Sequence, residues 1–151
     1  MNKIFALLLA STLTASAYAN QRILCRSVDV NTGERDTIEF FLKTDRNQRL
    51  LAAASKVKID GFGQDTDSTL FEDARIFALR ESQKFSRTYH TLDLINAWDL
   101  PVDLHVQFKS KVLGRNFSEM PALFVIVDET NNAGGNSILD YALLCSSTVT
   151  E

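Results

Sequence analysis

The sequence has no excess of charge of one sign, and this absence limits its partners. Its 151 residues include 16 basic and 19 acidic side chains, which give a formal net charge of −3. A mild negative charge spread along the chain predicts no basic footprint for nucleic acid or for an anionic lipid surface. With 45% hydrophobic and 23% charged residues, the chain is neither disordered nor a long repeat array. These proportions predict one globular domain.

Motifs of common enzymes are also missing. The sequence has no Gly-x-Ser-x-Gly nucleophile elbow and no glycine-rich phosphate loop, and no pair among its 19 carboxylates is distinguished by position. We therefore expect no cofactor and favour a non-catalytic binding protein. Its partner would be an envelope or extracellular protein or a small ligand, which the sequence does not identify. A small secreted enzyme with a carboxylate or metal site is the alternative.

Only one long apolar run is present, and it lies at the N-terminus. After Lys3, apolar residues fill most of positions 4–13, and small residues follow, ending in Ala17-Tyr18-Ala19. This order is typical of a secretory signal peptide. The run is shorter than the roughly 20 residues that a membrane-spanning helix needs. We expect residues 1–19 to be cleaved, which leaves one β domain over residues 20–151, without a membrane span, in a bacterial periplasm or outside the cell.

The two cysteines are too few for a disulfide scaffold that replaces a hydrophobic core. Cys25 and Cys145 lie near opposite ends of the expected mature chain, and each is inside a segment with strand character. Because exported proteins fold where disulfides persist, we predict a bond between these two residues. Two buried free thiols are the alternative.

Alternation of apolar and polar residues runs through most of the chain. This period of two is typical of strands that have one face in the core and the other in water. Clusters of Gly, Asn, Asp and Ser, which favour turns, separate the alternating segments. The predicted strands cover residues 22–30, 37–43, 50–60, 89–98, 102–109, 122–128 and 138–146.

An eighth segment, residues 69–85, fits two structures. Thr69 and Glu72 match a helix capping box, and apolar residues at helical spacing follow them. Phe77 and Leu79, however, lie on one side of a strand. Because the neighbouring segments all have strand character, we favour a strand here.

These eight segments predict an all-β fold. We expect a single-domain antiparallel β-barrel or sandwich of about eight strands, with the N- and C-terminal strands joined by the disulfide. Residues 123–127 are apolar on both faces, so their strand is central or covered on its second side. An eight-stranded outer-membrane barrel is a further alternative, although one Trp and three Tyr supply few aromatic girdle residues.

One loop has the composition of a calcium site. Residues 60–68 contain Asp60, Asp65 and Asp67 together with two glycines, and Ca²⁺ prefers such hard oxygen ligands. The spacing fits neither an EF-hand nor a repeated calcium-binding nonapeptide. We therefore favour a solvated turn and expect no metal, with these three carboxylates as the weak calcium candidate.

The two histidines give no paired metal site. His90 shares a predicted strand face with Leu92, and His105 lies on the polar face of another strand beside Asp103. No sequence spacing places the two imidazoles together, as a shared zinc or copper site would need.

Overall fold

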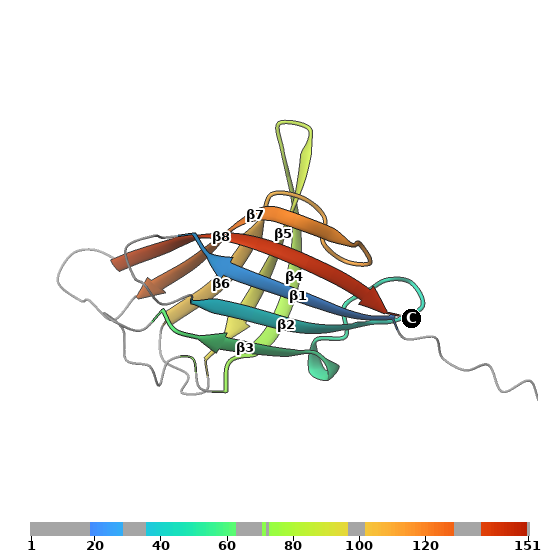
Figure 1. Ribbon diagram of the computed structural model, residues 1–151, viewed down its shortest axis with the longest axis horizontal. Coiled ribbons are helices and arrows are strands. Elements are labelled where there is room, and N and C mark those ends of the chain that lie inside the picture. Colours follow the sequence, from blue (N-terminus) through green and yellow to red (C-terminus); the bar gives the residue numbers. More distant parts are fainter. Residues whose placement is uncertain are drawn as a thin grey trace, which may run out of the picture.

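A single antiparallel sheet curves into a half-barrel in the computed structural model of the chain (Figure 1). The structure describes residues 19–28, 36–62, 71, 73–96, 102–128 and 137–150. The elements in this part of the chain are eight strands and one short 3-10 helix: β1 (Ala19–Ser27), β2 (Thr37–Thr44), η1 (Ala52–Ala54), β3 (Lys56–Asp60), β4 (Arg75–Lys84), β5 (Arg87–Ile95), β6 (Val102–Phe108), β7 (Phe117–Asp128) and β8 (Ser137–Thr150).

The strands follow the order β3-β2-β1-β8-β7-β6-β5-β4 across the sheet. All neighbouring strands are antiparallel, and they are consecutive in the chain except for β1 and β8. β3 and β4 are consecutive in the chain but form the two edges of the sheet. The expected all-β fold is therefore confirmed, with one sheet that has two open edges in place of a closed barrel or two stacked sheets.

The core fills the concave side of the sheet. Inward side chains alternate with outward ones along each strand, as in β2, where Ile38, Phe40 and Leu42 are buried. The outward positions carry charged residues such as Arg22 and Glu39, which form an ion pair across β1 and β2. The sequence left the direction of the alternation open, and the structure places the apolar set inside. The largest fully buried side chains are Phe40, Phe108, Phe124, Ile23, Ile38, Leu42, Leu92, Leu104, Ile126, Leu143, Val106 and Val112.

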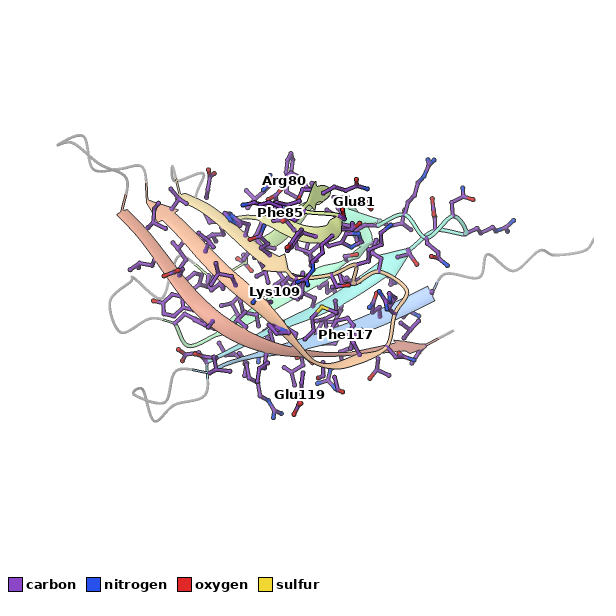
Figure 2. The ribbon with its side chains drawn as sticks, turned by 90° about the horizontal axis from the view of Figure 1, so that it is seen from above. Arg80, Glu81, Phe85, Lys109, Phe117 and Glu119 are labelled. Atoms are coloured by element: carbon purple, nitrogen blue, oxygen red, sulfur yellow. A yellow bond between two sulfur atoms is a disulfide. The ribbon has the colours of Figure 1, made fainter. Side chains whose placement is uncertain are left out.

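The predicted disulfide is present. Cys25 of β1 and Cys145 of β8 are directly opposite in the register of the two strands, and their sulfur atoms are bonded. Both cysteines are buried in the core, where Figure 2 shows the yellow bond. The bond therefore connects the two chain ends at the one junction of the sheet that no turn makes.

A cluster of aromatic residues packs in the core of the half-barrel. Phe62 is buried, and its ring lies 5.2 Å from the ring of Phe124 and 5.1 Å from that of Tyr141. Gly61 directly precedes Phe62 and has a φ of 83°. A Cβ atom at this position would lie 2.1 Å from a carboxylate oxygen of the buried Asp36, so only glycine fits.

The predicted strand over residues 50–60 is wrong in its first half. Leu50 makes only an isolated bridge with Thr44, and a short 3-10 helix occupies Ala52–Ala54. Alanine is depleted in strands because its methyl group gives little packing on a pleated surface. Ser55 ends the turn, since its hydroxyl donates to the Leu51 carbonyl and accepts from the Lys43 amide.

The ambiguous segment contains a strand, as favoured, but the expected common face for Phe77 and Leu79 is wrong. A β-bulge between Ile76 and Ala78 adds a residue, so Ile76 is opposite Leu94 while Leu79 is opposite Leu92. The extra residue switches the faces of β4. Leu79 is partly buried against the core, whereas Phe77 is 65% exposed. The expected capping residues, 69 and 72, lie outside the described part of the chain.

β7 is central, as its apolar composition predicts, because it pairs with both β6 and β8. Its inward residues Phe124 and Ile126 are buried, and its outward residue Leu123 is half-buried. Leu123 and Leu144 line a shallow hollow of about 560 Å³ on the outer face. The clusters of turn-favouring residues at 31–34 and 131–136 lie outside the described residues, and the strands on each side of them pair with each other.

A two-residue turn joins β4 to β5. Lys84 is opposite Arg87, and the intervening Phe85 and Ser86 have φ values of 50° and 61°. Positive φ at both positions is the pattern of a type I′ turn, which normally selects Asn-Gly. A side chain with a Cβ atom is disfavoured in this left-handed region, so the hairpin contains local strain at its tip.

Removing the disulfide should destabilise the fold strongly. We expect the double variant Cys25→Ala/Cys145→Ala to lose at most about 4 to 5 kcal/mol of unfolding free energy, since the bond closes a loop with a sequence separation of 120. Urea unfolding measures the loss. Reduced wild-type protein should match the variant, and a variant as stable as oxidised wild type would contradict this role.

Relieving the strained turn should stabilise the fold. We expect Ser86→Gly to raise the unfolding free energy by about 0.5 to 1 kcal/mol, because glycine adopts positive φ without a Cβ clash. Ser82→Gly is the matched control in the extended part of the same hairpin, and it should lower stability by a similar amount. Thermal unfolding of both variants measures the difference, and equal effects of the two would show that the turn is unstrained.

Candidate functional site

The two edge strands approach each other and leave a cleft beside their seam. β3 and η1 lie near β4 without forming a ladder with it. The adjacent surface is hollowed into a cleft of about 640 Å³, which we call the seam cleft. Its walls come from residues 47–52 after β2, residues 77–81 of β4 and residues 111–115 between β6 and β7, and His90 of β5 completes the lining. Residues far apart in the sequence therefore share this cleft.

Gln21 of β1 holds the 111–115 wall from inside the half-barrel. Its side-chain amide nitrogen donates to the carbonyl of Val112 at 2.6 Å and to the hydroxyl of Ser147 at 2.7 Å. Its oxygen accepts from the amide of Gly114 at 3.0 Å. Gln21 is 3% exposed, so breaking this network would leave buried polar groups unpaired. Val112 is buried, and the loop that carries it is thereby fixed against the core.

His90 binds the same loop from the other side. The backbone N–H of Val112 donates to Nδ1 of His90 at 3.1 Å. Because a backbone amide is only a donor, Nδ1 is the unprotonated nitrogen and the ring proton is on Nε2. Nε2 lies 3.3 Å from Oε2 of Glu81, to which it donates. Both ring nitrogens of the buried imidazole are therefore engaged.

Burial lowers the pKa of His90 from its ordinary value of 6.5. The hydrogen bond and charge of Glu81 act in the opposite direction, and the charge of Lys111 acts in the same direction as burial. The neutral ring is favoured for a geometric reason as well. A proton on Nδ1 would point at the Val112 N–H, so protonation would break the bond that holds the loop.

The seam cleft combines cations with an apolar wall. Lys111 lies 3.6 Å from Oε1 of Glu81, and Arg49 and Arg115 add two further cations to the lining. Three cations and one carboxylate leave this lining with a positive balance in a chain of net charge −3. Apolar side chains form one part of the lining, with Leu50, Phe77, Leu79 and Leu113, and the polar Asn47 and Gln48 also line the cleft.

Of the three residues of the weak calcium candidate, only Asp60 lies in the described part of the chain. Asp60 ends β3 and pairs with Lys58 at 2.7 Å. Asp65 and Asp67 lie outside the described residues. Within the ranges that the structure describes, no three His, Cys, Asp or Glu side chains are placed to hold a metal ion. Calcium binding by this loop stays a prediction, and the solvated turn remains the favoured interpretation.

The two histidines lie on opposite faces of the sheet. His90 is buried on the concave face with Leu92, and His105 is half-buried on the convex face. Burial lowers the pKa of His105 from its ordinary value, and the charge of the nearby Asp93 carboxylate opposes this shift only in part. Arg80 donates to both oxygens of Asp93, at 2.5 and 2.7 Å. This outer cluster is a surface ion pair, which contributes little to stability.

Sequence reasoning missed Gln21 and Glu81. A signal for Glu81 is present, because a two-residue turn at Phe85 and Ser86 sets a register that pairs Glu81 with His90. Gln21 has no comparable signal. Its partners Val112 and Ser147 are distant in sequence, and only the pairing of β1 with β8 brings them near.

No known protein family, curated protein or solved structure matches the chain. The class of protein therefore rests on the structure itself, which is a small all-β half-barrel with disulfide-linked terminal strands. The described part of the chain contains no helix that is long and apolar enough to cross a membrane.

Acidification should destabilise the protein. The pKa of His90 is lower in the folded chain than in the unfolded chain, so the unfolded chain takes up the proton first. The contribution of His90 to the free energy of unfolding should be fully present above about pH 6.5. It should fall as the pH drops from there through the folded-state pKa of His90. The slope is at most about 1.4 kcal/mol per pH unit for each histidine. Urea unfolding between pH 7 and about pH 5 measures it.

Two matched variants separate the histidines. His90→Gln keeps a side-chain acceptor for the Val112 amide and cannot titrate. In this variant, acidification should no longer lower the protection of the Val112 amide against hydrogen exchange. His105→Gln removes the outer histidine and should leave that change intact. The same pH response in both variants would contradict a role for His90 in holding the loop.

Proposed function

We propose that the chain is an exported, non-catalytic binding protein and that the seam cleft takes an organic anion with an apolar body. The observation that carries this proposal is the lining of the cleft. Arg49, Lys111 and Arg115 lie beside apolar side chains, and among the described residues Glu81 is the single carboxylate of the lining. The volume of about 640 Å³ is in the range of small-molecule sites.

The hydrogen bonds of His90 favour binding over acid–base catalysis. A general base needs a free lone pair within reach of its substrate. Nδ1 of His90 already accepts from the Val112 amide, and Nε2 carries the proton that Glu81 accepts. In this arrangement the imidazole fixes the loop and presents no free nitrogen to a ligand. The secreted-enzyme alternative would need another base.

The disulfide supports the exported part of the proposal. Cys25 and Cys145 are buried and bonded, and such a bond persists in an oxidising compartment. This agrees with the signal peptide expected at residues 1–19. The apolar face of the sheet points into the core. This favours a core-filled domain over an outer-membrane barrel, whose apolar band would face outward.

Matched probes test the ligand class. Octanoate, octylamine and octanol share an apolar chain and differ in charge, so we expect octanoate to bind tightest. Amide shifts in a ¹H–¹⁵N NMR titration should map to the lining, including Leu79 and Leu113. The variant Arg49→Gln/Arg115→Gln should weaken octanoate binding on the order of tenfold, since it removes two charged donors.

The control removes the same amount of charge elsewhere. Arg26→Gln/Lys56→Gln changes two exposed cations outside the seam cleft and should leave the octanoate affinity unchanged. Equal binding of the three probes, or shifts that map away from the lining, would refute the anion site. Turnover of an ester or amide probe, lost in Glu81→Gln, would instead favour the enzyme.

A further inference from the structure

The β4–β5 hairpin projects from the body of the half-barrel. Figure 1 shows it rising above the other strands, and every residue from 80 to 87 is exposed. Phe85 is at its tip and is 86% exposed, the largest exposure among the large apolar side chains of the described residues. The tip therefore presents an aromatic ring to the surroundings without packing it against the described core.

The turn is a poor place for phenylalanine if folding is its only role. Phe85 and Ser86 both have positive φ, where Asn and Gly are the favoured residues. An exposed aromatic ring in this conformation adds strain and gains no burial in the fold. Strained positions of this kind cluster at functional sites, which points to a use for the ring outside the folded chain.

Two cations flank the tip, and two more lie near the base of the hairpin. Lys84 and Arg87 flank the turn, and Nζ of Lys84 lies 5.8 Å from the centroid of the Phe85 ring. The neighbouring 109–116 segment adds Lys109 and Lys111, both exposed, and contains no carboxylate. Lys109 lines an outer hollow together with Tyr89, which lies at the base of the hairpin. Figure 2 shows the molecule from this side. Among the exposed residues 80–87, Glu81 is the one carboxylate, and Lys111 pairs with it.

We propose that this basic hairpin docks on a lipid surface with anionic headgroups, with Phe85 inserted among the headgroups. Each cation near an anionic leaflet contributes favourably, and an aromatic ring gains by leaving water at the interface. A specific protein interface buries about 800 Å² on each partner, more than one turn supplies. A lipid surface needs no matching pocket for the ring. The residues that test it, Lys84, Phe85 and Arg87, lie outside the described lining of the seam cleft, so it can fail or hold separately from the proposed ligand site.

Vesicle binding tests this docking. The full chain should cosediment with vesicles of phosphatidylglycerol and phosphatidylcholine, more weakly with phosphatidylcholine alone, and less as salt is added. Phe85→Ala should lower the partition coefficient about tenfold, since the ring's burial is lost. Lys84→Gln/Arg87→Gln should lower it by a similar factor on anionic vesicles only.

Further variants separate docking from folding. Phe85→Trp should keep binding, and its added emission should shift to the blue with anionic vesicles. Phe85→Asn/Ser86→Gly installs the favoured turn residues, so it should raise the melting temperature while it loses binding. Ile138→Ala removes an apolar side chain that is 63% exposed on β8 and should bind vesicles like wild type.

Several results would overturn the proposal. Equal binding to anionic and uncharged vesicles would remove the role of the cations. Unchanged binding of Phe85→Ala would remove insertion and leave a charge-only contact. Absence of vesicle binding, together with a protein crosslinked specifically through position 85, would assign the tip to a protein partner instead.

Discussion

The pairing of β1 with β8 is the interaction on which the other features of the half-barrel depend. Without it the chain would form two separate meanders, β1 to β3 and β4 to β8, each with an uncovered apolar face. The pairing runs from Asn20 opposite Thr150 to Ser27 opposite Leu143, and the buried disulfide lies within it. Both meanders thereby contribute to one core. The disulfide also limits how far the chain ends can separate when the protein unfolds, which is where its stabilisation arises.

A connected set of buried polar contacts extends from this pairing to the seam cleft. Gln21 and Ser147 come from the two paired strands, and Gln21 binds the loop that carries Val112. Val112 binds His90, and His90 binds Glu81 at the edge strand. Each buried side-chain polar atom of the described residues has a hydrogen-bond partner, which stabilises the loop in this position. Gln21, Ser147 and His90 are neutral groups, and they hold the loop that brings Lys111 and Arg115 to the cleft.

Much of the strand content could be predicted because alternation is a local property of the sequence. Val106 and Phe108 alternate with polar residues, and β6 forms where that pattern occurs. β4 shows the limit of such reasoning, since its bulge reverses the faces after Ile76 and no residue pattern announces it. The site was less accessible to prediction than the fold. Its residues come from β1, β4, β5 and two loops, and the chemistry of each is ordinary in isolation.

The sequence by itself determined which segments form strands and which two thiols could pair, because side-chain alternation and the cysteine count are readable along the chain. Only the tertiary structure decided which strands are neighbours, which face is inside and where the charges gather. The formal net charge of −3 predicted no basic surface, yet Lys84 and Arg87 flank the turn of one hairpin and Lys109 lies at its base. Net charge is a sum over the chain, whereas recognition depends on local density. That density is set by strand register and turn geometry, which depend on contacts between residues distant in sequence.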